Sequence, residues 1–433
     1  MKRLLPKSEF GRNVLTLMTG TSIAQAIPIA VAPILTRIFS PQDFGVFALY
    51  SAIALVSSAI ATGRYDLAIT LPSEDEDALH LLLLSLLIAL SVSILLLVVV
   101  VLFNSTIASL LGNHEIKPWL YFVPVSVFLT GVYQSLNYWL NRHKRFKGLA
   151  FTRIVQSCLS SAGQAGIGLG IHGSTGLVLG SILGQFASVV SFITVSKNGF
   201  SSALKNITMS GVWRQAERYK RFPLLQAPAT LIEANSAQLP VMLLGVFFSS
   251  TIVGFFSLSQ RVIRLPMNIV GSSIGDVFRQ RASRDFYIYG DSSVIFIATL
   301  KKLLFISTPL FLIFIFLAPD LFALVFGENW RVAGEYAQIM TPLFWLSFVV
   351  SPLSVMFIIA EKQNLDLVIQ IILVGSSVSA LAVGHYIFSS PKYAIAAFTF
   401  VYSVKYLIEL YLSYKFCKKE NFCMESINVE QSN

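Results

Sequence analysis

Charged residues are scarce in this chain of 433 residues, of which only 12% are Asp, Glu, Lys or Arg. Soluble domains carry roughly a quarter charged residues, so a soluble fold of this size could not cover its surface with polar groups. The three cysteines are too few for a disulfide framework. Disorder is excluded because 55% of the residues are hydrophobic and 34 of them are phenylalanine. The composition therefore favours a protein whose surface faces lipid.

Long apolar runs accompany this shortage of charge. Twelve stretches of about 20 residues are apolar enough to cross the ~30 Å hydrocarbon core as helices. Runs such as residues 81–103 are too long for the short alternating strands of a β-barrel. We therefore predict an all-α polytopic membrane protein with spans at residues 13–36, 43–63, 78–103, 117–140, 150–170, 175–196, 223–247, 252–274, 294–317, 335–360, 365–386 and 393–414.

Lys and Arg residues are distributed unevenly between the two sets of loops. Twelve spans place both termini on one side, and the segments on that side carry 25 of the 32 Lys and Arg residues. The opposite side carries four. Cytoplasmic loops contain an excess of Lys and Arg, so we predict that both termini are cytoplasmic. The net charge of +10 is then a topology signal, and no nucleic-acid partner is expected.

Two segments of the chain are similar to each other. Residues 35–49 align without gaps on residues 244–258, and six positions are identical, including Gly45 with Gly254. Each segment is the tight outer turn between the first two spans of a six-span half. Six spans per half give both halves the same orientation, so we predict parallel repeats related by an axis along the membrane normal. Chance similarity between apolar segments is the alternative.

The two halves set the predicted domain limits. Within the linker between them, residues 210–221 are expected to form a short basic helix at the membrane interface, with Trp213 and Tyr219 at headgroup level. No loop is long enough for a separate folded domain, which a membrane-bound polymerase or ligase would need. The predicted parts are an N-terminal lobe (1–196), a cytoplasmic basic linker (197–222), a C-terminal lobe (223–414) and a cytoplasmic tail (415–433).

Arg261 and Arg264 lie near the middle of the eighth predicted span, three residues apart and so on one helix face. A charge at that depth costs at least ~2.5–3.5 kcal/mol, so such residues are candidates for function. A guanidinium group makes paired charge-assisted hydrogen bonds to phosphate and keeps its proton. We predict that this pair binds an anionic substrate; the alternative is that both side chains extend toward the cytosol.

A second polar group lies in the middle of the seventh predicted span, where Glu233, Asn235 and Gln238 occur, and Gln25 occupies the middle of the first span. A carboxylate in this setting could exchange protons and couple an ion to transport. It could equally pair with an arginine of the eighth span and hold the helices together. The residues leave both interpretations of Glu233 open.

The N-terminal half carries its charges nearer the span ends. Arg37 lies near the outer end of the first span, and Arg64 with Asp66 lies at the inner end of the second. The last two residues form either an ordinary end-of-helix pair or the cytoplasmic mouth of a cavity. Lys405 and Glu409 are four residues apart in the last span, and we expect them to neutralise each other.

Two further patterns favour structure over chemistry. The acidic run at residues 75–77 has the form of a glycosyltransferase metal motif, but Ser73 and Glu76 have the spacing of a capping box that opens the third span. The five histidines all fall in loops or near span ends, so neither a metal site nor a proton relay is predicted.

Five stretches of the sequence carry the pattern of a known family: residues 33–47 (PILTRIFSPQDFGVF), 63–72 (GRYDLAITLP), 277–283 (VFRQRAS), 326–340 (FGENWRVAGEYAQIM) and 351–354 (SPLS). In these stretches the chain resembles bacterial O-antigen flippases. These flippases belong to the multidrug/oligosaccharidyl-lipid/polysaccharide (MOP) exporter superfamily. The similarity extends over almost the whole chain.

The resemblance implies two six-helix lobes around a basic central cavity. It also implies transfer of an undecaprenyl-diphosphate-linked oligosaccharide from the inner to the outer leaflet of the bacterial cytoplasmic membrane, as part of lipopolysaccharide biosynthesis. The expected partners are this substrate, membrane lipids and other polysaccharide assembly proteins. The family has no catalytic residues, so neither enzymatic activity nor a cofactor is expected.

The basic cavity implied by the family is placed here on Arg261 and Arg264, with Arg37 and Arg64 as further members. The alternative is a cation-coupled exporter of drugs or other small molecules from the same superfamily. Such an exporter would need buried acidic residues in the N-terminal half, and none stands out there.

Overall fold

Helices make up nearly all of the chain. The computed structural model describes residues 9–203, 208–264, 267 and 271–418. The first eight residues and most of the predicted cytoplasmic tail lie outside this part. Within it, extended pairing is limited to one isolated bridge between Asp291 and Lys418. The prediction of an all-α fold is confirmed.

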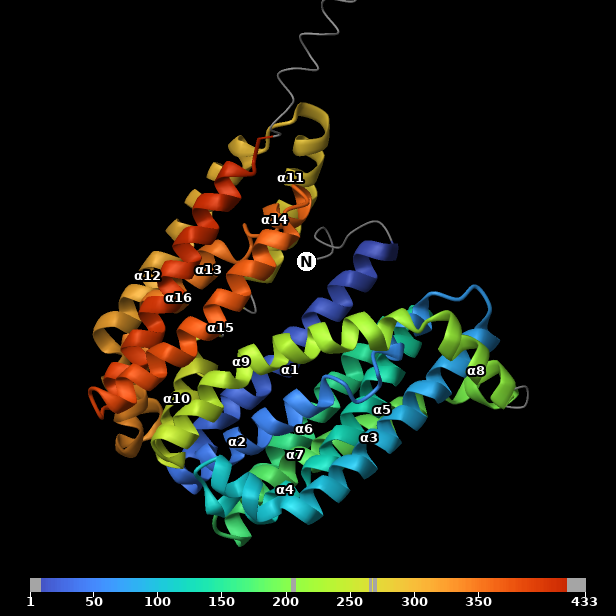
Figure 1. The fold of residues 1–433 in the computed structure, drawn as a ribbon, viewed down its shortest axis with the longest axis horizontal. Helices are drawn as coiled ribbons and strands as arrows, with labels where there is room; N and C mark the ends of the chain where they lie inside the picture. Colours follow the sequence, from blue (N-terminus) through green and yellow to red (C-terminus); the bar gives the residue numbers. More distant parts are fainter. Residues whose placement is uncertain (1–8, 204–207, 265–266, 268–270, 419–433) are drawn as a thin grey trace, which may run out of the picture. The chain divides into compact units, whose positions relative to one another are not determined.

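Helices coincide in order with the twelve predicted spans (Figure 1). In the first half they are α1 (Glu9–Ile38), α2 (Pro41–Ser58), α3 (Asp75–Leu110), α4 (Lys117–Leu120) with α5 (Val123–Arg142), α6 (Phe146–Gly170) and α7 (Thr175–Ala203). In the second half they are α9 (Ala227–Phe247), α10 (Ser250–Ile263), α12 (Ser293–Phe326), α13 (Arg331–Val350), α15 (Gln363–Tyr386) and α16 (Pro391–Lys415).

Shorter elements connect these helices. They are the 3₁₀ turns η1 (Tyr65–Thr70), η2 (His114–Ile116) and η6 (Glu328–Trp330), the π turn η4 (Phe222–Gln226), and the helices α8 (Met209–Arg218), α11 (Ser272–Tyr289) and α14 (Met356–Ile359).

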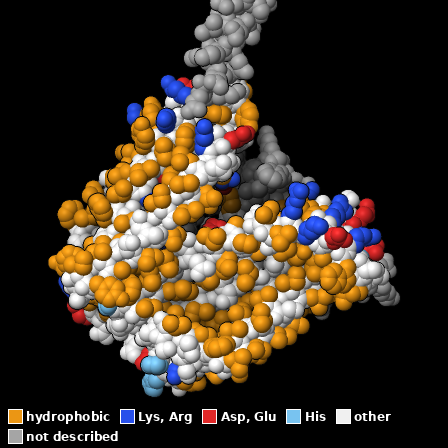
Figure 2. Space-filling model, viewed as in Figure 1, with side chains coloured by type: hydrophobic (Ala, Val, Ile, Leu, Met, Phe, Trp, Pro, Cys, Tyr) orange, Lys and Arg blue, Asp and Glu red, His pale blue; other side chains and the backbone are white. Residues whose placement is uncertain are grey.

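The surfaces of the long helices are apolar. Among the described residues, seven helices are long and apolar enough to cross a membrane, and the α4–α5 pair, bent by 49°, makes eight. In each of the seven, at most 39% of the most apolar stretch is buried inside the protein. Figure 2 shows hydrophobic side chains spread along the helices. Exposing such area to water costs ~25 cal/mol per Å², so the chain is a multi-pass membrane protein.

The eighth predicted span differs from the structure. α10 ends at Ile263, and the next described helix, α11, begins at Ser272 and continues to Tyr289. Most of α11 therefore lies in a stretch that was predicted to be a loop. Hydropathy alone does not report that α10 ends at Ile263 or that α11 extends through this stretch.

Two compact units make up the chain, residues 1–257 and residues 258–433. The first unit contains α1 to α9 and the beginning of α10, and the second contains the remaining helices. The predicted lobe limits, with a linker at residues 197–222, stay a prediction.

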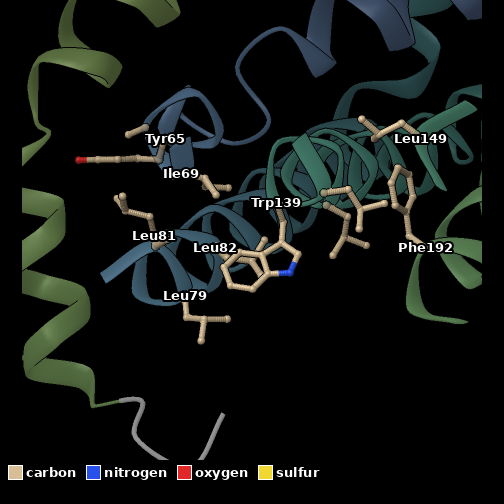
Figure 3. Packing of buried hydrophobic residues seen from close by; sticks show 12 residues of the cluster. Tyr65, Ile69, Leu79, Leu81, Leu82, Trp139, Leu149 and Phe192 are labelled. Carbon is tan, nitrogen blue, oxygen red and sulfur yellow. The ribbon is translucent and has the colours of Figure 1, made fainter. Parts of the chain in front are cut away.

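A buried apolar cluster in the first unit joins η1 to α3, α5 and α7 (Figure 3). Ile69 of η1, Leu82 of α3 and Phe192 of α7 are at most 2% exposed. Trp139 of α5 and Tyr65 of η1 complete the packing, and the Tyr65 hydroxyl donates to the carbonyl oxygen of Ala216 at 3.0 Å. The cluster holds the segment that follows α2 in place.

The predicted interfacial helix exists as α8, which lies against the beginning of α3 (Figure 1). The backbone N–H of Thr208 donates to Nε2 of His80 at 3.2 Å, and Arg214 pairs with Asp77 at 3.0 Å. Trp213 is 72% exposed. Figure 2 shows charged side chains gathered at this end of the first unit. A position of α8 at headgroup level stays a prediction.

Arg142, at the end of α5, connects that helix to the segment before α3. Its Nε donates to Oδ1 of Asp75 at 2.9 Å, and its Nη1 and Nη2 donate to the carbonyl oxygens of Pro72 and Ser73 at 2.5 and 3.0 Å. The predicted capping box is wrong, because Glu74 is the N-cap residue of α3 and no side chain caps the helix. The acidic run instead supplies partners for arginines.

We expect Arg142→Ala to destabilise the first unit by roughly 1.5–3 kcal/mol, because two backbone carbonyls lose a charged donor. The Arg142 side chain is 12% exposed, so water replaces it poorly. Thermal unfolding of the purified protein in detergent measures the change. Arg214→Ala is the matched control: that side chain is 69% exposed, and we expect a loss below about 1 kcal/mol. Equal unfolding temperatures for the two variants would contradict this role of Arg142.

Candidate functional site

A cavity of about 390 Å³ lies within the first unit, between α2, α5, α7 and α9. Its volume falls in the range of about 300–1,000 Å³ that is common for small-molecule sites. We call it the N-terminal pocket. Its lining consists of Phe47, Tyr50, Ser51, Ala54, Leu55, Ser58, Ala59, Arg64, Thr130, Gln134, Ser181, Gln185, Thr230 and Ala234.

Arg64 is the charged member of this lining, which contains no Asp or Glu. Its Nε atom is buried and has no hydrogen-bond partner in the described structure. A buried donor without an acceptor costs about 1–3 kcal/mol. A ligand that places an acceptor in the pocket would remove this cost, so the pocket is suited to an electron-rich group.

The backbone around Arg64 is unusual. Arg64 has a φ of 61° and Gly63 has a φ of 57°, and the left-handed conformation is unfavourable for residues with a Cβ atom. Backbone strain of this kind persists where surrounding packing imposes it, often at functional sites. The buried cluster around Tyr65 and Ile69 supplies that packing immediately after Arg64.

Asp66 does not form an ion pair with Arg64 in the described structure. Its side chain is fully buried, and Oδ1 accepts a hydrogen bond from Oγ1 of Thr62 at 2.6 Å. The expectation that the N-terminal half has no buried acidic residue is therefore wrong, although Asp66 is not part of the pocket lining. Of the two alternatives for Arg64 and Asp66, the end-of-helix pair is therefore absent from the described residues, whereas Arg64 lines a cavity.

The uncharged polar residues of the pocket escaped the sequence analysis. Gln134 follows Thr130 by four residues on α5, and Gln185 follows Ser181 by four residues on α7. Residues four apart share one helix face. Such polar pairs also occur in ordinary contacts between helices, so the sequence alone gives little reason to select them.

Arg261 and Arg264 lie at the end of α10, in the second unit. Arg261 is in the last turn of the helix and Arg264 directly follows its end. The guanidinium carbon of Arg264 lies 5.5 Å from the ring centroid of Phe344 on α13. Tyr402 and Tyr406 of α16 interact electrostatically with the Arg264 guanidinium group. Arg264 is thus directed toward helices of its own unit, although both arginines are exposed.

The candidate residues of α9 lie on different faces of the helix. Thr230 and Ala234 line the N-terminal pocket, and the half-buried Gln238 lies one turn further along the same face. Asn235 is exposed and donates to the carbonyl oxygen of Leu231 at 2.9 Å. Glu233 is exposed.

The remaining predicted positions lie apart from the pocket. Gln25 and Arg37 are exposed residues of α1, and neither contributes to the pocket lining. In α16 the expected ion pair is confirmed, because Nζ of Lys405 lies 2.6 Å from Oε1 of Glu409. In the part of the chain that the structure describes, no three His, Cys, Asp or Glu side chains form a metal-binding group.

The family model for polysaccharide biosynthesis proteins matches residues 34–335, well over half of the chain. The chain belongs to the polysaccharide biosynthesis protein family. The matched region of this polysaccharide biosynthesis protein includes the whole N-terminal pocket as well as Arg261 and Arg264. The family resemblance seen in the sequence is confirmed. No protein with a curated description matches the sequence significantly.

Solved structures of flippases and multidrug transporters share the fold of this polysaccharide biosynthesis protein. The lipid II flippase MurJ in an inward closed conformation aligns with a TM-score of 0.72 at 12% identity, over 93% of this chain and 87% of that chain. An inward-facing MATE-family multidrug resistance transporter of the MOP superfamily aligns with 0.60 at 12% identity, over 93% and 94%. A MOP superfamily transporter from Pyrococcus furiosus, described as having a binding pocket of reverse polarity, aligns with 0.55 at 13% identity, over 94% and 95%.

At these identities the similarity shows the fold alone. The polysaccharide biosynthesis protein shares the helical membrane architecture of these flippases and transporters.

Proposed function

We propose that the protein transfers a lipid-linked oligosaccharide, an O-antigen or related polysaccharide repeat unit on undecaprenyl diphosphate, from the inner to the outer leaflet of the bacterial cytoplasmic membrane. The observation that carries this proposal is the N-terminal pocket, whose lining has a single charged residue, Arg64, and no carboxylate. Such a pocket favours an anion over a cation. The diphosphate supplies the anion, and the hydroxyl and amide groups around Arg64 suit a glycan.

The energetics explain why such a protein is needed. An isolated anion in hydrocarbon costs tens of kcal/mol in the idealised limit, so a diphosphate does not cross a bilayer unaided. A polar chamber with fixed guanidinium groups lowers this cost, while the prenyl chain remains in lipid. The inside-negative membrane potential then favours outward movement of an anion by about 2.3 kcal/mol per charge per 100 mV.

We also propose that Arg264 and Arg261, in the second unit, bind the diphosphate during transfer. Gln25, Arg37, Asn235 and Gln238 are proposed as additional polar contacts along the substrate path. Because α9 also carries Glu233, we propose this exposed carboxylate as the ion-coupling group where coupling is used. Both termini are proposed to be cytoplasmic, in agreement with the Lys and Arg distribution, and the six-span lobes are proposed to alternate access.

The second candidate function is a cation-coupled exporter, since MATE transporters share the fold. A buried cation needs a partner of opposite charge. The charged residue in the lining of the N-terminal pocket is an arginine, which repels a cation, and the lining contains no Asp or Glu, so we favour the flippase.

Reconstitution tests the choice between these functions. The purified protein is inserted into vesicles that contain lipid-linked saccharides extracted from cells lacking its gene, and the glycan exposed outside is measured with a lectin. We expect the protected glycan to become accessible. In parallel vesicles loaded with ethidium, we expect no protein-dependent efflux. Ethidium efflux without glycan movement would establish the exporter and reject the flippase.

A further inference from the structure

The N-terminal pocket contains hydrogen-bonding groups that a diphosphate alone does not use. Oε1 of Gln134 on α5 and Oε1 of Gln185 on α7 are both buried without a hydrogen-bond partner in the described structure. Each is an acceptor that requires a donor. A diphosphate at neutral pH has acceptors and almost no donors, so it cannot satisfy these two oxygens.

Three hydroxyl groups of the pocket already donate to helix carbonyl oxygens and so do not donate to these two amide oxygens. Ser58 donates to the carbonyl oxygen of Ala54 at 2.6 Å, Ser181 donates to Val178 at 2.8 Å, and Thr230 donates to Gln226 at 2.9 Å. A hydroxyl has one hydrogen to donate, and in each of these residues that hydrogen is donated to a backbone carbonyl oxygen of the helix. These side chains therefore present lone pairs to the pocket.

Tyr50 contributes an apolar ring to the wall. Its hydroxyl lies 2.6 Å from Oγ of Ser126 and 3.3 Å from the carbonyl oxygen of Phe122, which occupies the polar end of the side chain. With Phe47, the lining offers two aromatic rings beside its polar groups. The pocket thus combines an acceptor-rich wall, aromatic surface and one cationic donor.

A sugar ring has the complementary chemistry. Its hydroxyls donate to amide and hydroxyl oxygens, its ring and hydroxyl oxygens accept from a guanidinium N–H, and its C–H face packs on aromatic rings. We propose that the N-terminal pocket is a binding subsite for the first sugar of the glycan, with Gln134 and Gln185 as the residues that recognise its hydroxyl or acetamido donors. This inference rests on the proposed function and adds a basis for selecting among lipid-linked substrates.

Binding of two short-chain probes tests the subsite. Farnesyl diphosphate carries the anion alone, and farnesyl-diphospho-N-acetylglucosamine carries the anion with one sugar. Affinities for the detergent-purified protein are measured by intrinsic tryptophan fluorescence. We expect the wild-type protein to bind the sugar-bearing probe about 10- to 100-fold more tightly, since each of two net hydrogen bonds contributes up to about a factor of ten.

The variants separate the sugar from the anion. Gln134→Met and Gln185→Met keep the side-chain length and remove the acceptor, and we expect each to reduce the preference for the sugar-bearing probe about tenfold. Affinity for farnesyl diphosphate should stay within about twofold. Arg64→Ala should weaken binding of both probes. Gln164→Met is the matched control, because Gln164 is a buried glutamine of α6 that donates to the carbonyl oxygen of Leu177 and lies outside the pocket lining.

The outcomes are distinguishable. If the wild-type protein binds neither probe, the proposed function fails. If it binds both but the two glutamine variants, folded as judged by their unfolding temperature, retain the sugar preference, the subsite is rejected and the flippase proposal survives. A Gln164→Met variant that loses the preference while Gln134→Met keeps it would likewise overturn the assignment.

Discussion

Substituting Arg64 by alanine is expected to reduce glycan export roughly 10- to 150-fold, the range that corresponds to losing one hydrogen bond to a charged group. In cells that depend on the protein for surface polysaccharide, such a loss would abolish the polymer at the cell surface. The reason is that Arg64 is the cation of the N-terminal pocket and its Nε has no partner within the protein. Its removal therefore takes away anion binding and breaks no hydrogen bond of Nε.

Backbone geometry provides a control for folding at the same position. Arg64 has a φ of 61°, a conformation that costs roughly 1–2 kcal/mol for a residue with a Cβ atom. Arg64→Gly removes the side chain and relieves this strain, so we expect equal or higher thermal stability together with lost transport. Arg64→Lys keeps the positive charge but lacks the planar guanidinium group, so we expect its transport activity to lie between those of the wild type and Arg64→Ala. These variants separate function from stability.

Complementation of surface polysaccharide, with protein level measured by immunoblot, checks the prediction. The matched control is Arg331→Ala, because Arg331 is exposed and pairs with Glu328 and Asp320, far along the chain from the pocket residues. It should support normal polysaccharide. In the second unit, Arg264→Ala should resemble Arg64→Ala. If the Arg64→Gly variant is present at a normal level and supports normal surface polysaccharide, Arg64 has no role in transport.

Hydropathy was sufficient to predict where the helices lie, because the requirement of ~20 apolar residues per span is local in sequence. It was insufficient at the eighth predicted span, where α10 ends at Ile263 and α11 extends through a stretch that was predicted to be a loop. The helix cap was also missed. Asp75 binds Arg142, which is 67 residues away, and this partner is invisible to a reading of neighbouring residues.

The candidate site was predictable only in its charges. A charge in the middle of an apolar span is costly enough to stand out, and this criterion named Arg261 and Arg264, whereas Arg64 was placed at a span end and joined the candidate cavity through the family resemblance. Gln134 and Gln185 cost less to bury and are common in helix contacts, so one sequence gives little reason to select them. Their significance arises from α5 and α7 meeting around one cavity, which is a tertiary property.

Gly45→Ala and Gly254→Ala are each expected to destabilise the protein by about 3 kcal/mol or more, the upper end of the cost of overpacking. A Cβ atom on Gly45 of α2 would lie 1.7 Å from the carbonyl oxygen of Ser250, and one on Gly254 of α10 would lie 1.8 Å from that of Pro41. Both obstacles are backbone atoms, so no side-chain rotation relieves the overlap. Elsewhere in a helix the same substitution stabilises by up to about 1 kcal/mol.

Gly166 provides the matched control, because it lies within α6 and a Cβ atom there would meet nothing within 4 Å. Thermal unfolding in detergent and protein yield are measured for the three alanine variants. Gly166→Ala should unfold at the same or a higher temperature, and the other two at clearly lower temperatures. An unchanged unfolding temperature for Gly45→Ala would mean that α2 and α10 do not cross this closely.

The internal repeat predicts how the effects of the two glycine substitutions are related. In the alignment of residues 35–49 with 244–258, Gly45 matches Gly254 and Pro41 matches Ser250, so the two close approaches are the same contact made reciprocally, as a two-fold relation between repeats requires. The two single variants should then cost similar amounts. The double variant should cost less than their sum, because the first alanine already separates the helices and neighbouring sites are coupled. Strict additivity would instead indicate two independent contacts and argue against the repeat as the source of this crossing.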